Sequence, residues 1–510
     1  MTASTVPGFT NRHLWLVLGS LMLSVLMASM EISIISTALP TIVGEFQAFD
    51  SFAWVGTAYI VTSAIGTPLL GKLSDLFGRR NVFQATLALF IVGSLLCGFA
   101  QSMGQLIAFR ALQGLGGGAI QALAFAILGD ILPPRERGRY IGYFTLAFVG
   151  AALLGPLIGG VIIDHFSWPW IFWINVPLGL LAMSVSHVAL RLPFSRRSAK
   201  LDWTGAALLS AGVACLMIAL EEGQDGWGQQ HVVALVVAAV VATGVFLVVE
   251  QRAAEPIIPL RLFADRAVTT SVFVGMSAGV VAFGAGQFLP LYFQDSLFVS
   301  PTESGLRMLP QMLGVTMATF GVGRLIARTG KCKPWPIVGQ AVGVAGLLVI
   351  SQISGTTSYL SLVLPMIAIG FAMASVFTAT SIVSQNAVEY TDLGVVTSTV
   401  MFFRNLGGSI GLAVFGTILN STIRSELPAR IDVVAEEATD LIRSPSEIEA
   451  LPLLERQAVI DSVALGVGRI YLVCAGVMAA GFVLALFLPE RPLRLRAGLS
   501  DAMEQQRADA

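Results

Sequence analysis

The dominant feature of this sequence is a series of almost uncharged apolar runs, each long enough to cross a lipid bilayer as a helix. A helix needs about 20 apolar residues to span the hydrocarbon core. With 55% hydrophobic and 12% charged residues among 510, the chain is too apolar for a soluble globular protein. We therefore predict an all-α, polytopic membrane protein. The fourteen predicted transmembrane helices lie near 14–39, 51–70, 82–100, 104–129, 140–163, 168–190, 203–220, 232–249, 267–293, 304–327, 335–353, 357–383, 393–420 and 468–488.

The runs contain an internal repeat. Glycines recur at a constant offset of 252 residues: Gly71 with Gly323, Gly78 with Gly330, Gly155 with Gly407, and Gly159 with Gly411. This offset gives a repeat unit of six helices and leaves two further helices inserted between the copies. Both copies begin on the same side, so we expect parallel repeats, an arrangement in which binding sites lie between the halves near the midplane.

The repeat predicts four regions. Residues 1–190 form an N-terminal six-helix bundle, and 191–266 hold the two inserted helices with their flanking segments. Residues 267–490 form a C-terminal six-helix bundle, and 491–510 form a cytoplasmic tail. The second bundle includes a long, charged outer loop at 421–465, which is either a pair of solvated amphipathic helices or a surface that contacts substrate or partner.

The distribution of positive charge predicts the orientation. Lys72, Arg79 and Arg80 follow the second run, and basic residues resist translocation across the membrane. If both termini are cytoplasmic, 22 of the 30 Lys and Arg residues fall on the inner side. We therefore expect cytoplasmic termini, and the short termini and compact loops favour a bacterial inner membrane.

The sequence lacks the motifs of several classes of site. The four cysteines are scattered, without a disulfide framework or metal spacing, so no metal site is predicted. No Gly-x-x-x-x-Gly-Lys-Ser/Thr sequence occurs, which argues against nucleotide-driven pumping, and the net charge of -1 gives no reason to expect nucleic acid.

Several motifs resemble a known family. GKLSDLFGRR at 71–80 resembles the cytoplasmic signature turn of the major facilitator superfamily. Further residues and motifs resemble those of the fourteen-span drug:proton antiporter branch. They are MEISIISTALP at 30–40, Trp54, Tyr59, RALQG at 110–114, Gly150, GPLIGG at 155–160, WIFWINVPLG at 170–179 and FFRNLGGSIG at 402–411. The resemblance covers nearly the whole chain and implies export by alternating access, without naming a cargo.

Two ionisable residues lie inside predicted spans at matching depth. Glu31 and Arg110 are each about 12 Å from the outer end of their helix. An ionisable group at the bilayer centre costs about 2.5 to 3.5 kcal/mol, so function or a partner must retain it. Glu31 is therefore predicted to carry protons with Arg110 beside it; the alternative is a structural ion pair. The family motif usually has aspartate at this position, and Glu31 keeps its charge.

The signature turn carries a second charged set. Asp75 can accept hydrogen bonds from Arg79 and Arg80 or meet the positive start of a facing helix. By the resemblance, Gly71, Asp75, Gly78, Arg79 and Arg80 form a latch that closes the inner side. The alternative is an orientation signal supplied by the cations alone.

Small residues recur in the fifth span. They are Gly150, Gly155, Pro156, Gly159 and Gly160. The resemblance makes them the antiporter motif, whereas small residues also serve ordinary close packing of helices, and Pro156 permits a bend.

Polar and aromatic residues at membrane depth are candidates for a substrate cavity. Arg404 and Asn405 lie at mid-span, and Arg404 requires a partner: Glu31, backbone carbonyls or an anionic group of the cargo. The other candidates are Trp54, Tyr59, Gln113, Phe283, Gln287, Tyr292 and Gln294. Each of these residues has packing as its alternative role.

These observations lead to one functional prediction with two alternatives. We expect a proton-coupled exporter of lipophilic, cationic compounds that acts as a monomer, contacts only lipid, protons and substrate, and needs no cofactor. An exporter of lipid or of an endogenous metabolite is the first alternative. A membrane receptor or enzyme is the second, although no paired carboxylates, nucleophile with base, or metal cluster lies at membrane depth.

Overall fold

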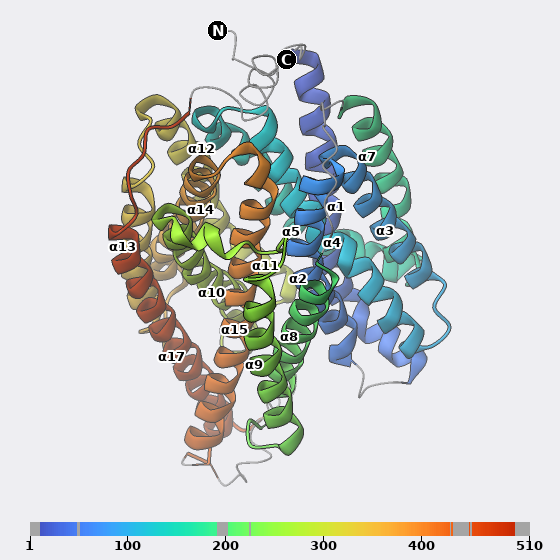
Figure 1. Ribbon diagram of the computed structural model, residues 1–510. Helices are drawn as coiled ribbons and strands as arrows, with labels where there is room; N and C mark the ends of the chain where they lie inside the picture. Colours follow the sequence, from blue (N-terminus) through green and yellow to red (C-terminus); the bar gives the residue numbers. More distant parts are fainter. Residues whose placement is uncertain are drawn as a thin grey trace, which may run out of the picture.

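The computed structural model describes residues 11–47, 52–190, 202–223, 226–428, 430–431, 448 and 451–494. Within these ranges the chain is helical and contains no strand, with fourteen helices of at least 15 residues (Figure 1). They are α1 (Asn11–Phe46), α2 (Phe52–Phe77), α3 (Arg79–Gly98), α4 (Met103–Ile131), α5 (Pro134–His165), α7 (Asn175–Ala189), α8 (Trp203–Glu222), α9 (Gln230–Glu250), α10 (Arg266–Asp295), α12 (Leu309–Thr329), α13 (Pro334–Ile350), α14 (Tyr359–Ala387), α15 (Leu393–Glu426) and α17 (Leu453–Leu486). Short helices α6 (Trp170–Trp173) and α11 (Pro301–Arg307) precede α7 and α12.

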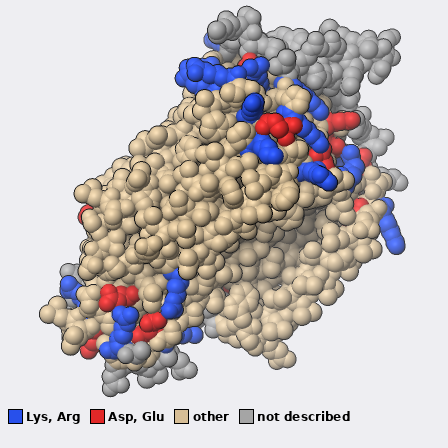
Figure 2. Space-filling view, turned by 90° about the vertical axis from the view of Figure 1, so that its left-hand side faces the viewer, with Lys and Arg blue, Asp and Glu red and all other residues tan. Residues whose placement is uncertain are grey.

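The helices match a membrane protein in length and composition. In the described part of the chain, eleven helical segments are long and apolar enough to cross a bilayer. The remaining long helices, α2, α12 and α13, complete the bundle. On the face shown in Figure 2, most Lys, Arg, Asp and Glu residues gather at the two ends, and the surface between them is almost free of charged residues. The prediction of an all-helical protein with fourteen long helices is confirmed.

The repeated glycines occupy equivalent places in the fold. Gly78, between α2 and α3, has φ 91°, and Gly330, between α12 and α13, has φ 73°. L-residues with a side chain rarely adopt such values, so both turns favour glycine. We call the end of the bundle that carries these two turns the signature end, and the other the opposite end. We also call α1–α7 the N-terminal half and α10–α17 the C-terminal half.

The two halves meet chiefly through two related helix pairs, α2 with α15 and α5 with α12. In each pair, the second long helix of one half packs on the fifth of the other. Near the signature end, a Cβ added at Gly71 would collide with the side chain of Ser398, and one at Gly323 with the backbone of Gly138. Glycine therefore permits the close approach at both crossings.

The inserted helices α8 and α9 form a hairpin that touches both halves. The hairpin packs on itself, and α8 also contacts α2 and α15. Apolar residues of α2, α8 and α15, including Val61, Met217 and Ala413, share one buried cluster. At the signature end, Lys72 Nζ lies 2.8 Å from Glu255 Oε2, in the segment that follows α9.

The helices extend into the segment predicted as a long outer loop. α15 continues to Glu426 and α17 begins at Leu453, so both ends of 421–465 are helical. Ion pairs support these extensions: Arg469 Nη2 lies 3.0 Å from Glu426 Oε1, and Arg430 Nη1 lies 3.3 Å from Asp461 Oδ2. The middle of that loop, the segment before Asp202 and the tail from 495 lie outside the described residues.

The glycine crossing gives a first prediction. Gly323→Leu places a side chain against the Gly138 backbone, so we expect the signature end to separate. Spin labels on the exposed residues Asn81 and Lys331 would then report a longer distance by double electron–electron resonance. Gly321→Leu is the matched control, because nothing lies within 4 Å of a Cβ at Gly321. Equal distances in both variants would contradict the prediction.

Candidate functional site

The first candidate site is a buried carboxylate held by three helices of the N-terminal half. Glu31 on α1 is 2% exposed, and Arg110 on α4 is 1% exposed. Arg110 Nη1 donates to Glu31 Oε1 at 2.5 Å, and Asn175 Nδ2 on α7 donates to Glu31 Oε2 at 2.5 Å. Both carboxylate oxygens are therefore engaged within this half.

A second layer of polar and aromatic groups fixes the guanidinium of Arg110. Its Nη1 also donates to Gln113 Oε1 at 2.7 Å, and its Nε donates to the Val55 carbonyl at 3.3 Å. The ring of Tyr59 lies 4.4 Å from Arg110 Cζ and supplies a cation–π contact. The positive charge is thus neutralised, hydrogen-bonded and stacked without bulk water.

Ser94 and Asn175 belong to this site, although the sequence did not single them out. Ser94 Oγ accepts from Asn175 Nδ2 at 3.0 Å and from Gln113 Nε2 at 3.1 Å, which links α3, α4 and α7. Both residues are fully buried. The signal was a lone asparagine in an apolar span, because a buried amide requires partners.

Proton binding at Glu31 would alter the polar contacts of this site. An ionised Glu31 satisfies two donors, whereas a protonated one would have to present its own hydrogen to a new acceptor. Proton uptake therefore requires an acceptor for the new O–H group, and it removes the negative charge that pairs with Arg110. The Glu31–Arg110 contact has the geometry of the structural ion pair that was the alternative to a proton carrier. The same geometry is also compatible with proton transfer by Glu31.

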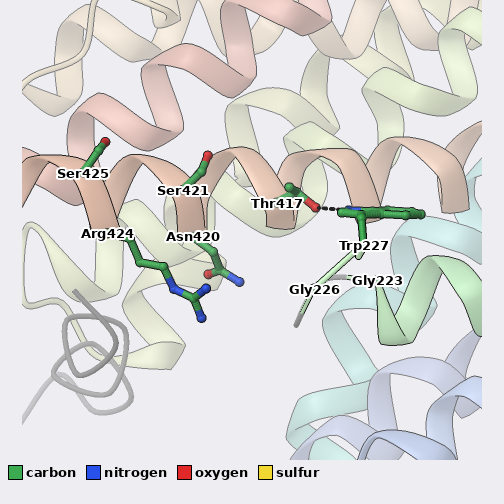
Figure 3. Close-up of a pocket in the computed structure, with 8 residues that line it drawn as sticks. All are labelled: Gly223, Gly226, Trp227, Thr417, Asn420, Ser421, Arg424 and Ser425. Carbon is green, nitrogen blue, oxygen red and sulfur yellow. Dashed lines mark hydrogen bonds between the residues drawn. The ribbon is translucent and has the colours of Figure 1, made fainter. Parts of the chain in front are cut away.

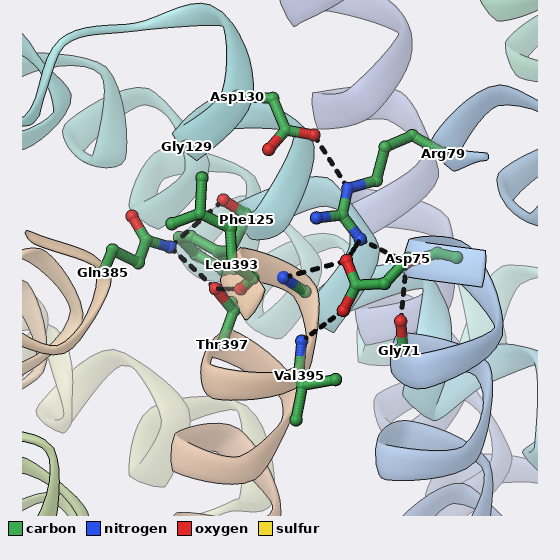
Figure 4. A network of polar contacts seen from close by, with 12 residues as sticks. Gly71, Asp75, Arg79, Phe125, Gly129, Asp130, Gln385, Leu393, Val395 and Thr397 are labelled. Carbon is green, nitrogen blue, oxygen red and sulfur yellow. Dashed lines mark hydrogen bonds and ion pairs between the residues drawn. The ribbon is translucent and has the colours of Figure 1, made fainter. Parts of the chain in front are cut away.

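The second candidate site closes the signature end around Asp75 (Figure 4). Asp75 Oδ2 accepts from the backbone N–H of Val395 at 2.8 Å, and Oδ1 accepts from that of Gly394 at 3.3 Å. Both donors lie in the first turn of α15, whose N–H groups have no partner inside the helix. Asp75 thus caps a helix of the other half, where the positive end of the helix dipole favours a carboxylate.

Arg79 joins this contact to the rest of the N-terminal half. It pairs with Asp75, and its Nε donates to Asp130 Oδ2 on α4 at 2.7 Å. Arg79 Nη1 also donates to Ser74 Oγ at 2.5 Å. Arg80 makes no hydrogen bond or ion pair with the described residues. Of the five predicted latch residues, Asp75 and Arg79 carry the polar contacts, while Gly71 and Gly78 supply backbone geometry.

Two arginines of α5 add further bonds between the halves at this end. Arg135 Nε donates to the Ala327 carbonyl at 2.7 Å, and its Nη2 donates to the Arg328 carbonyl at 3.0 Å. Arg137 Nη1 donates to Gln385 Oε1 on α14 at 3.0 Å. The signature end is therefore closed by polar contacts as well as by glycine packing.

The predicted glycine motif of α5 is only partly a close-packing feature. A Cβ at Gly155 would collide with Ser33 of α1, whereas nothing lies within 4 Å of one at Gly160 and only Leu26 approaches one at Gly150. Gly159 is buried, and Pro156 lies on the exposed face of the helix. The motif therefore packs tightly on α1, the helix that carries Glu31, at Gly155 and more loosely at Gly150.

The predicted cavity residues do not line one cavity in this structure. Tyr59 and Gln113 belong to the Glu31 site. Tyr292 is buried in the core of the C-terminal half, where its hydroxyl donates to the Ser354 carbonyl at 2.8 Å. Phe283 lines a pocket of about 50 Å³ between α2, α8, α10 and α15. The positions of the others are as follows: Gln287 is exposed, Gln294 bonds weakly to Ser304, and Trp54, Arg404 and Asn405 are half-buried.

A larger cavity of about 360 Å³ lies at the opposite end, between the α8–α9 turn and α15. Trp227 Nε1 donates to Thr417 Oγ1 at 3.1 Å across its edge. The side chains of Asn420 and Arg424 extend from α15 toward the open space (Figure 3). The inserted hairpin therefore contacts the C-terminal half here and the N-terminal half at the signature end.

Comparison with known proteins identifies the family. The sequence pattern described as the Major Facilitator Superfamily matches residues 21–412, which is more than half of the chain. The chain belongs to the major facilitator superfamily. It is therefore an integral, multi-pass membrane transporter rather than an enzyme.

The relatives agree with this assignment. The chain is 34% identical to an uncharacterized MFS-type transporter of Mycobacterium tuberculosis over 478 residues, which cover 93% of this chain and 69% of that one. It is 34% identical to Multidrug resistance protein 3 of Bacillus subtilis over 415 residues, 81% of each chain. The structure of the proton:xylose symporter XylE aligns with a TM-score of 0.62 at 14% identity, covering 97% of this chain and 100% of that one. That likeness shows the fold alone.

The Glu31–Arg110 pair gives a second prediction. In this transporter, Arg110→Met leaves a buried carboxylate unpaired, so we expect a loss of about 3 to 5 kcal/mol in the free energy of unfolding. Glu31→Gln in the same chain should recover at least about 1 kcal/mol of that loss. SDS-induced unfolding, followed by tryptophan fluorescence, measures both. Strictly additive effects of the two substitutions would show that the pair is not coupled.

The Asp75 contact gives a third prediction. Asp75→Asn removes the charge that α15 and Arg79 both favour, so we expect a larger population open at the signature end. The distance between spin labels at Asn81 and Lys331 reports that population. Arg80→Gln is the control, since Arg80 has no polar partner among the described residues. A distribution like that of the control would exclude a latch at Asp75.

Proposed function

We propose that this protein is a drug:proton antiporter that exports lipophilic compounds by alternating access. The observation that carries the proposal is the Glu31 site: a buried carboxylate at membrane depth, paired with Arg110 through a charge that a bound proton would remove. Intramembrane acids mark proton and substrate pathways by default. The name of the Bacillus subtilis relative, Multidrug resistance protein 3, supports drug export.

The contacts between the halves support the alternating part of the proposal. The hydrogen bonds described above between α1–α7 and α10–α17 all lie at the signature end. Glu31 and its partners lie within one half, so the halves can rock apart at this end without removing its ion pair. Rocking of two repeats about a site between them is the usual form of alternating access.

The remaining features of the proposal follow from the sequence. The positive-inside rule supports cytoplasmic termini, and the compact loops support a bacterial inner membrane. We propose a monomer driven by the proton gradient without a cofactor. The sequence predicted a cationic cargo, whereas both oxygens of the Glu31 carboxylate, which would attract a cation, are engaged here. We therefore propose that the cargo is lipophilic, and the Glu31 site assigns it no charge.

The test is the fourth prediction. In proteoliposomes under an imposed pH gradient, the wild-type protein should move a fluorescent lipophilic dye, and Glu31→Gln should lose gradient-driven transport by about tenfold or more. Glutamine keeps the shape of the side chain and cannot exchange a proton. Glu45→Gln is the matched control, because Glu45 lies on the same helix and is exposed. Unchanged transport in Glu31→Gln would exclude Glu31 as the proton carrier.

A further inference from the structure

Arg404 is a cation at membrane depth that has no acid partner in the described part of the chain. It lies on α15 twelve residues after Asp392, about 18 Å along the helix axis. The described residues contain no carboxylate within ion-pair distance of Arg404 and no side chain or carbonyl that accepts a hydrogen bond from it. Its guanidinium instead makes a cation–π contact, with Cζ 4.4 Å from the centre of the Phe377 ring. Of the partners expected from the sequence, Glu31 and backbone carbonyls are therefore not used in this structure.

The neighbours of Arg404 place it where the two halves meet. Phe377 lies on α14 of the C-terminal half, and its ring packs edge-on against Phe125 of α4 at 5.3 Å. Phe125 and Phe377 belong to one cluster that spans both halves. Arg404 is half-buried beside these rings, so it faces the junction of the halves. A depth of about 18 Å within a hydrocarbon core of about 30 Å also separates it from lipid headgroups.

The charge balance at this depth determines what Arg404 attracts. Glu31 and Arg110 neutralise one another, which leaves Arg404 as the uncompensated charge among the described residues at mid-span. A lone cation in a medium of low dielectric attracts anions and repels cations far more strongly than in water. Its position between the halves is also where parallel repeats bind substrate.

We propose that Arg404 binds an acidic group of the cargo, and that the preferred substrates of this transporter are lipophilic acids. The planar guanidinium offers a fork of N–H donors that matches a carboxylate or sulfonate, while Phe377 and Phe125 supply an apolar surface beside it. The inference rests on the proposed export function and adds the charge class of its cargo.

The experiment compares three fluorescent dyes with one lipophilic body and different end groups: a carboxylate, a methyl ester and a trimethylammonium. Fluorescence anisotropy measures their binding to purified protein in a non-ionic detergent, with empty micelles as the blank. We expect the wild type to bind the carboxylate dye about tenfold more tightly than the ester, and the trimethylammonium dye most weakly. Arg404→Gln should remove this order and keep ester binding, whereas Arg404→Lys should retain part of the preference.

Two results would overturn the inference. In the first, the wild-type protein binds the trimethylammonium dye as tightly as the carboxylate dye. This result does not depend on whether a variant folds. The other is Arg404→Gln with an unchanged carboxylate preference. Binding requires no pH gradient, so it can be measured apart from transport. If the protein transports none of the dyes but binds them in the expected order of affinity, the result supports Arg404 as the acid-binding site and rejects only the proposed antiport.

Discussion

A charged side chain inside the bilayer has no water to solvate it, so a neighbour must neutralise it or its exposure must have a use. At Glu31 the neighbours come from α4 and α7, and both lie in the same half as α1. The carboxylate therefore fixes the arrangement of these helices. Because the ion pair is complete within one half, that half can move as a body at no cost in unpaired charge. Arg404 differs, since the described part of its own half offers it an aromatic ring and no acid.

The two crossings between the halves use the same packing and opposite electrostatics. At α2 and α15, the carboxylate of Asp75 accepts from free N–H groups at the start of a helix. At α5 and α12, Arg135 donates to free carbonyls at the end of a helix. The offset of 252 residues aligns Asp75 with Ala327, so the second copy has no carboxylate to offer. An arginine from the facing helix supplies the charge there instead, because a helix end presents acceptors where a helix start presents donors.

The sequence was most informative where a single physical rule decides the outcome. Lipid-length apolar runs predicted the long helices, and the glycine offset identified Gly78 and Gly330, which both have positive φ. The partnership of Asn175 with Glu31 could not be predicted, since it depends on how α1 and α7 face one another, and the two residues are 144 positions apart in the sequence. Tyr292 illustrates the opposite case: a polar tip on an aromatic ring suits both a cavity and a core, and only the carbonyl of Ser354 decides between them. The helix ends near 426 and 453 could not be predicted either, because ion pairs between distant residues support these helices beyond their apolar runs.

The inserted hairpin adds a constraint that the two halves alone do not have. At the signature end it is joined to α2 by the ion pair between Lys72 and Glu255, and at the opposite end it is joined to α15 by the hydrogen bond from Trp227 to Thr417. A hairpin bound to one half would simply move with it. The segment after α9 also reaches the C-terminal half at the signature end, where Arg261 Nη2 lies 2.9 Å from Asp392 Oδ1. The hairpin therefore bridges the two halves, and it cannot keep all of these contacts if the halves rotate against each other. The hydrogen bond involves an exposed indole, whereas the ion pair holds a nearly buried lysine whose desolvated charge is costly to separate. Of these two contacts, the hydrogen bond to α15 is therefore the weaker one.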